Sequence, residues 1–101
     1  MSETFAYPAS VVHDEAGFYL VTFPDFPEAA TDGESRKAAL EQASDALEEA
    51  IAGRMNRGDA IPHPGKRKAR QALVPVPAQM AVKAALYMAV KESGIRNTEL
   101  A

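Results

Sequence analysis

The chain of 101 residues contains no cysteine, which excludes disulfide bonds, thiolate metal sites and cysteine nucleophiles. No apolar run reaches the about 18 residues of a membrane span, and the N-terminus lacks the basic and then apolar pattern of a secretory signal. There is also no glycine-rich phosphate loop, paired-histidine motif or dinucleotide fingerprint. With 47% hydrophobic residues, the chain is one small domain or a domain with an appendage, and we expect a soluble, cytoplasmic protein.

The net charge of −3 conceals a division between two parts of the chain. Residues 1–65 carry 12 acidic and 4 basic side chains, whereas residues 66–101 carry 2 acidic and 7 basic ones. An acidic body suits a basic protein partner, and a basic segment suits phosphate or an acidic surface. Small proteins also segregate charge by chance, but a clustered basic run makes chance a weaker explanation. This run contains Lys66, Arg67, Lys68 and Arg70.

Three strands are expected in the first third of the chain. Residues 5–13 and 18–23 are joined by a polar turn and predict a β-hairpin. Pro8 predicts an edge position or a bulge in the first strand, because proline has no N–H to donate to a ladder. The second strand is apolar at nearly every position, which predicts burial on both faces or packing beneath a helix. A turn over residues 25–27 then leads to a short third strand at about residues 28–32.

A helix over residues 35–57 is the clearest element of the sequence. Ser35 is placed to cap its N-terminus, and Gly58 is placed to end it. Its apolar residues recur at steps of three and four, which predicts one core-facing stripe. The stripe consists of Leu40, Ala43, Leu47, Ala50 or Ile51, and Met55.

The pattern then predicts a loop over residues 59–70, a last strand over residues 70–76 and a helix over about residues 78–93. Prolines flank the strand and favour a sheet edge. The helix is apolar nearly all round, so it is either a second core helix or a subunit interface that gives a homodimer or larger oligomer. The fold class is therefore α+β, with a small antiparallel sheet in β-β-β-α-β order followed by a C-terminal helix.

The stretch from Phe18 to Ser35 carries a family resemblance. An aromatic strand, then Pro-Asp-Phe-Pro-Glu, then Thr-Asp-Gly-Glu-Ser before an Ala/Leu helix resembles the N-terminal domain of HicB-type antitoxins, the partners of small mRNA-cleaving HicA toxins. The resemblance covers about residues 5–76 and implies a reduced ribonuclease-H-like fold. It also implies that residues 1–76 bind and neutralise a basic toxin. The positions that match the motif are Asp25, Pro27, Glu28, Thr31, Gly33 and Glu34.

Acidic side chains are the expected contacts for such a toxin. Those on the long helix are inferred from charge alone, and an ordinary solvated helix face is an equally good interpretation of them. The expected toxin-binding residues are Asp25, Glu28, Glu34, Glu41, Asp45, Glu48 and Glu49.

Residues 77–101 are expected to form a helix and the start of a helix-turn-helix, with Thr98 as N-cap and Glu99 in the first turn. The pattern stops at Ala101, so either the DNA-binding region is truncated, or this chain has lost its recognition helix, or the similarity is accidental. Truncation is the favoured interpretation. In full-length form the family represses its own operon, so operator DNA is an expected partner only if this region is complete.

Two other functions remain open at this stage. One is a nucleic-acid-binding module that uses Lys66, Arg67, Lys68 and Arg70. The other is a metal-dependent hydrolase that uses the turn carboxylates Asp25, Glu28, Asp32 and Glu34. It is disfavoured because the first strand lacks the acidic residue that ribonuclease-H enzymes need. His13 and His63 have no evident catalytic partners. We therefore predict no catalytic residue, no metal and no cofactor.

Overall fold

The computed structural model describes residues 5–93 and has two helices and four strands in that range. The elements are β1 (Ala6–His13), β2 (Tyr19–Phe23), β3 (Phe26–Gly33), α1 (Arg36–Arg57), β4 (Ala72–Pro75) and α2 (Ala78–Glu92). The predicted β-β-β-α-β order with a following helix is confirmed. The expected start of a helix-turn-helix, with Thr98 and Glu99, lies outside the described residues.

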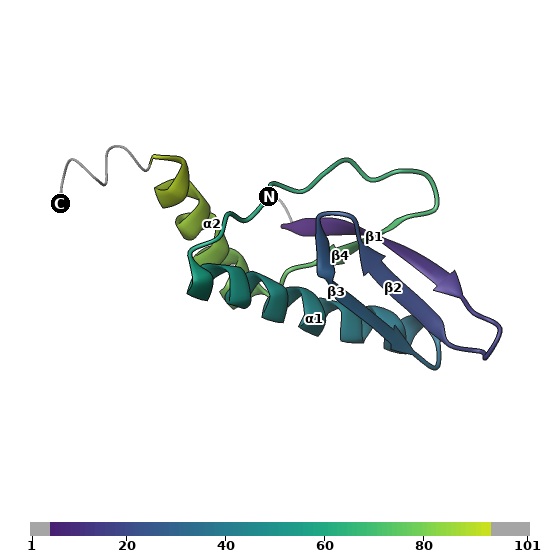
Figure 1. Cartoon of the computed structure of the whole chain (residues 1–101). Helices are drawn as coiled ribbons and strands as arrows, with labels where there is room; N and C mark the ends of the chain where they lie inside the picture. Colours follow the sequence, from purple (N-terminus) through teal and green to yellow (C-terminus); the bar gives the residue numbers. More distant parts are fainter. Residues whose placement is uncertain (1–4, 94–101) are drawn as a thin grey trace.

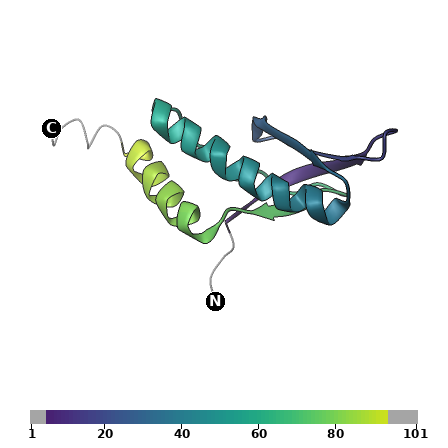
Figure 2. The ribbon, with the colours of Figure 1, turned by 90° about the horizontal axis from the view of Figure 1, so that it is seen from below.

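The four strands form one antiparallel sheet in the order β3-β2-β1-β4. Helix α1 lies along one face of this sheet and packs mainly against β3 and β2 (Figure 1). Helix α2 lies beyond the end of the sheet, beside the C-terminal half of α1 (Figure 2). The fold is therefore a sheet covered on one face by a single long helix, with a second helix at one end.

Pro8 lies in a central strand whose registers with β2 and β4 run without a shift, so neither the predicted edge position nor the alternative of a bulge occurs there. Strand β1 pairs with β4 through Ala6–Ala9 and with β2 only from Ser10 onward. Val76 N donates to Phe5 O at 2.8 Å, so the backbone of Pro8, three residues further on, points away from β4. The backbone nitrogen of Pro8 thus points toward β2, but β1 pairs with β2 only from Ser10 onward. The lack of an N–H at Pro8 therefore removes no hydrogen bond from the β1–β2 ladder.

The turn between β2 and β3 comprises Pro24 and Asp25, so the predicted three-residue turn that begins at Asp25 was wrong. Phe23 and Phe26 pair directly across it, which makes a two-residue hairpin. Strand β3 is consequently longer than predicted. It includes Pro27, which an edge strand tolerates because one side of its backbone needs no ladder partner.

The core lies between α1 and the sheet. The stripe on α1 is close to the predicted one, although Leu40 and Met55 lie at its margin and are only half-buried. Gly33 allows α1 to approach β3 closely, since a β-carbon at this position would lie 2.5 Å from Ala39 N. The buried residues of α1 are Ala39, Ala43, Leu47, Ala50 and Ile51.

Both predicted ends of α1 are confirmed. The Ser35 side chain accepts a hydrogen bond from Ala38 N at 3.0 Å, which satisfies one of the free N–H groups of the first turn. Gly58 adopts the left-handed conformation with φ of 76°, and its N–H bonds to the carbonyls of Arg54 and Met55.

The sheet face opposite α1 is largely open. Val12, Leu20 and Leu73 are all exposed there, so burial of the second strand on both faces does not occur. The reason is that α2 lies beyond the end of the sheet and covers neither face (Figure 2).

Candidate partner-binding surface

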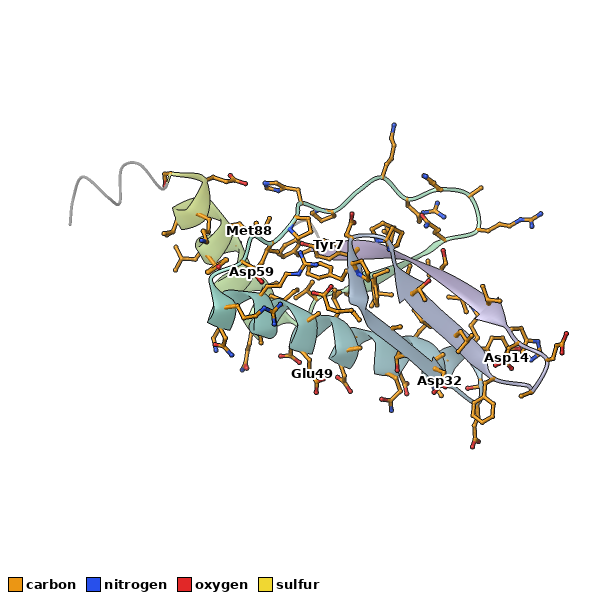
Figure 3. The ribbon with its side chains drawn as sticks, viewed as in Figure 1. Tyr7, Asp14, Asp32, Glu49, Asp59 and Met88 are labelled. Carbon is orange, nitrogen blue, oxygen red and sulfur yellow. The ribbon has the colours of Figure 1, made fainter. Side chains whose placement is uncertain are left out.

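Four acidic side chains gather on the exposed side of α1, opposite its buried stripe. Three of them follow one another at steps of four residues, and the fourth lies seven residues after the first, which places all four on one side of the helix over adjoining turns. Figure 3 labels Glu49 on this side. Within residues 5–93, none of them forms an ion pair with a basic side chain. We call this surface the α1 acidic face; it consists of Glu41, Asp45, Glu48 and Glu49.

Asp25 and Glu28, the other main expected contacts, have partners within the chain. Asp25 Oδ2 accepts from Gly65 N at 2.9 Å. Glu28 forms a two-pronged ion pair with Arg54, with distances of 2.7 Å to Nε and 2.9 Å to Nη2. The hydrogen bond from Arg54 holds the pKa of the Glu28 carboxyl below its ordinary value. Glu34, by contrast, lies exposed in the bend before α1.

Arg54 is a residue whose role the sequence did not reveal. Besides Glu28, its guanidinium donates to Ala60 O at 3.3 Å. It also lies 4.6 Å from the ring centroid of Phe26, within cation–π distance. Arg54 therefore ties together β3, α1 and the loop that follows α1. Sequence position had indicated only a cation near the C-terminal end of a helix.

Residues 59–65 have no regular secondary structure but are anchored along their length. Their backbone carbonyls accept hydrogen bonds from side chains of three different elements, and the Ile61 side chain is buried. His63 also pairs with Glu92 of α2. The donors are Tyr87 OH to Asp59 O at 2.7 Å, Arg54 Nη1 to Ala60 O at 3.3 Å, and Tyr7 OH to Pro62 O at 2.6 Å.

Tyr7 is the buried member of this set. Burial raises the pKa of Tyr7 to about 12; the negative charge of Asp25 acts in the same direction and the positive charge of Arg54 acts against it. The phenol therefore stays protonated at neutral pH, as its role as hydrogen-bond donor to Pro62 requires.

The basic run is held in a defined turn. Gln71 N donates to Lys68 O at 3.1 Å, and Lys68 N donates to the Gln71 side chain at 2.8 Å. Arg70 adopts a positive φ of 70°, which is uncommon for a residue with a β-carbon. Figure 1 shows the loop passing over β1 before it enters β4. The turn presents four exposed cations, which are Lys66, Arg67, Lys68 and Arg70.

Helix α2 exposes an apolar ridge. Val82 and Leu86 retain 71% and 66% of their accessible surface, whereas Ala84 and Met88 on the other side are buried. The helix is thus only partly a core helix. None of the described helices is long and apolar enough to cross a membrane.

The turn carboxylates do not form a metal-binding cluster. Asp25 is bonded to Gly65 and Glu28 to Arg54, in different directions. Across residues 5–93, no group of three or more histidine, aspartate or glutamate side chains is arranged to hold a metal ion.

A family model described as the HicB-like antitoxin of bacterial toxin–antitoxin systems matches residues 6–85. The chain belongs to the HicB-like antitoxin family. The relatives include antitoxin HicB 2 of Photorhabdus laumondii subsp. laumondii, which is 40% identical over 101 residues. Antitoxin HicB 1 of the same organism is 40% identical over 95 residues, and antitoxin HicB of Escherichia coli K12 is 36% identical over 95 residues.

This HicB-like chain spans only part of the length of those relatives. The matches cover 100%, 94% and 94% of the chain, but 70%, 60% and 69% of the relatives in the same order. The crystal structure of the N-terminal domain of Burkholderia pseudomallei antitoxin HicB shares the fold. Its TM-score is 0.58 at 23% identity, with 70% of this chain and 96% of that chain covered.

Proposed function

We propose that this HicB-like chain binds and neutralises a small, basic, mRNA-cleaving toxin of the HicA type in the cytoplasm. The observation that carries the proposal is the α1 acidic face, whose four carboxylates have no counter-ion among the described residues. A ribonuclease must present positive charge to the phosphates of its substrate. An acidic surface on the antitoxin competes with RNA for that positive charge and speeds the association of antitoxin and toxin.

We also propose that residues 1–76 form the toxin-binding domain. Residues 77–101 would begin a region that binds operator DNA when it is complete. The apolar ridge of α2 supports a further proposal, that residues 78–93 contribute to a contact between subunits. An exposed ridge of this kind is unfavourable in water unless a second apolar surface covers it.

The test of toxin binding is co-expression with the small basic protein encoded beside this gene. We expect the two proteins to purify as a complex. The double charge reversal Glu41→Lys and Asp45→Lys should weaken binding by about ten-fold or more at low salt, because it puts like charges in contact. Glu15→Lys is the control for the single reversal Glu41→Lys, because both change the net charge equally and Glu15 is an exposed acid in the β1–β2 turn.

The result that would overturn the proposal is the absence of a complex between the co-encoded protein and the correctly folded chain. An equal loss of affinity in the Glu15→Lys control would instead mean that overall charge drives association, so the α1 acidic face would not be the interface. Measuring both variants at several salt concentrations separates these outcomes, because exposed charge pairs are screened by salt.

A second candidate function is nucleic-acid binding through the basic turn. The supporting observation is that Lys66, Arg67, Lys68 and Arg70 are all exposed in one ordered turn. Such binding should weaken steeply as salt increases, because it depends on phosphate contacts. Titration of a labelled duplex in increasing salt tests it, and Arg67→Ala with Lys68→Ala should remove any binding observed.

A further inference from the structure

The sheet face opposite α1 carries a row of side chains that changes from apolar to acidic. Val12 on β1 lies opposite Leu20 on β2, and Leu20 lies opposite Asp32 on β3. Directly opposed residues of antiparallel strands share one face of the sheet. The neighbouring residues Val11 and Val21 belong to the core side, so the row points away from α1. All three side chains of the row are exposed.

The basic turn lies on the same face, at the opposite end of this row. Ser10 is two residues before Val12 on β1 and therefore shares its face. Gln71, which directly precedes β4, places its Nε2 3.5 Å from Ser10 Oγ, and its side-chain oxygen accepts from Lys68 N at 2.8 Å. These contacts hold the turn on the β1–β4 side of the sheet. From β4 to β3, the face thus changes from basic through apolar to acidic.

This face has a raised half and a low half. The loop that leads to β4 passes over β1 (Figure 1), and Pro8 on that side of β1 is buried. On β2 and β3, by contrast, the side chains of Leu20, Thr22 and Asp32 are exposed. The raised half therefore lies on the β1–β4 side and carries the cations, and the low half lies on the β2–β3 side and carries Asp32.

We infer that a second copy of the chain docks on this face, related to the first by a two-fold axis that runs along the strands between β1 and β2. Such an axis reverses the strand order, so β4 of each copy faces β3 of the other. The raised half of each copy then fits against the low half of its partner. The basic turn meets Asp32 at both sides, and Val12 and Leu20 of the two copies pack together at the centre.

Charge favours a second copy over other occupants of this face. A nucleic acid would bind the cations of the basic turn, but Asp32 and the exposed Glu34 after β3 would repel its phosphates. A basic toxin would meet the opposite conflict at the basic turn. A second copy presents both signs of charge in reversed order and so matches both ends of the row. A two-fold axis across the strands would instead place β3 against β3, with like charges together.

This contact is separate from the surfaces that we propose for the toxin and for α2. The α1 acidic face lies on the helix that covers the other face of the sheet (Figure 1), so each copy of the dimer keeps its toxin-binding surface. Helix α2 lies beyond the end of the sheet (Figure 2). The inference can therefore fail while the proposed function stands, and the reverse is also true.

The test exchanges charges between two variants of the full chain, both carrying Leu86→Lys so that the ridge of α2 does not contribute. One variant has Asp32→Lys, and the other has Lys66→Glu with Lys68→Glu, whose ammonium groups form no ion pair among the described residues. Each should weaken self-association by about ten-fold or more, because like charges then face each other. An equimolar mixture should restore it, because both contacts again join opposite charges. Glu49→Lys on α1, an equal change of charge to Asp32→Lys, should have little effect.

Sedimentation over a range of concentrations measures these associations. A Leu86→Lys chain that is monomeric at every concentration, or a mixture that associates as weakly as its components, would overturn the inference. Loss of toxin binding in Asp32→Lys with self-association intact would also overturn it, because the toxin would then cover this face. Hydrogen exchange of the Leu86→Lys chain does not depend on the charge variants. The amides of residues 66–70 should become better protected as concentration rises, and unchanged protection would contradict the contact.

Discussion

At the scale of single residues, the fold depends on a few polar side chains that join distant segments. Arg54 bonds to Glu28 on β3 and to the carbonyl of Ala60 beyond α1. Tyr7 bonds from β1 to Pro62. These contacts hold an irregular segment in place where regular secondary structure is absent, which accounts for its order.

Replacing Glu28 with Gln should lower the free energy of unfolding at neutral pH by about 1 kcal/mol. The ion pair with Arg54 is two-pronged, but the Glu28 side chain is 39% exposed, so water screens part of its energy. The pKa of Glu28 is lowered in the folded chain. The contribution is therefore present above the ordinary carboxyl pKa and is lost as pH falls through the lowered pKa.

Chemical denaturation of Glu28→Gln and the unmodified chain at several pH values measures this effect. The two stabilities should converge toward acidic pH. Glu34→Gln is a suitable control, because Glu34 is exposed and has no ion pair among the described residues. A difference that stays constant with pH would contradict the assigned role of the Glu28 charge.

Replacing Tyr7 with Phe should lower the free energy of unfolding by about 1 kcal/mol, because the Pro62 carbonyl loses its hydrogen-bond donor. The pKa of Tyr7 is raised to about 12 in the folded chain. Its neutral form therefore stabilises the fold fully below the ordinary tyrosine pKa, and this contribution is lost as pH rises toward that raised value. Ultraviolet titration of the 3 tyrosines should show one late transition. That transition should disappear in Tyr7→Phe and persist in Tyr19→Phe.

At the scale of elements, the parts of the fold that local signals determine were predictable. The helix ends follow from Ser35 and Gly58, which act through their immediate neighbours. The place of Pro8 was not predictable, because it depends on where the β1–β2 register stops. The β2–β3 turn was also missed. Local sequence places Phe26 and Pro27 in a turn, but the pairing of Phe26 with Phe23 makes both residues part of β3.

The exposed ridge of α2 makes a prediction at this same scale. Leu86→Lys should change the stability of the isolated fold little, because Leu86 is 66% exposed. It should, however, weaken self-association if the ridge is the subunit contact, since a charge would then be buried. Sedimentation across a range of concentrations measures this, with Gln79→Lys on the same helix as control. A monomer mass at all concentrations in the unmodified chain would rule out the subunit contact.

At the scale of the whole molecule, charge and shape act together. The acidic residues predicted on the helix do lie on one exposed side of α1, because helical spacing alone places them there. The internal partners of Asp25 and Glu28 could not be foreseen, because Gly65 and Arg54 lie 40 and 26 residues away along the chain. Only the folded arrangement separates these two acids, which have internal partners, from the four on α1 that lack a counter-ion among the described residues.

The most direct test of the central claim is a titration of the co-encoded toxin's ribonuclease activity with purified chain. We predict that cleavage falls to background near an equimolar ratio, and that the double variant Glu41→Lys and Asp45→Lys requires a clear excess. Undiminished cleavage in the presence of excess folded chain would contradict the claim that this HicB-like chain neutralises a toxin.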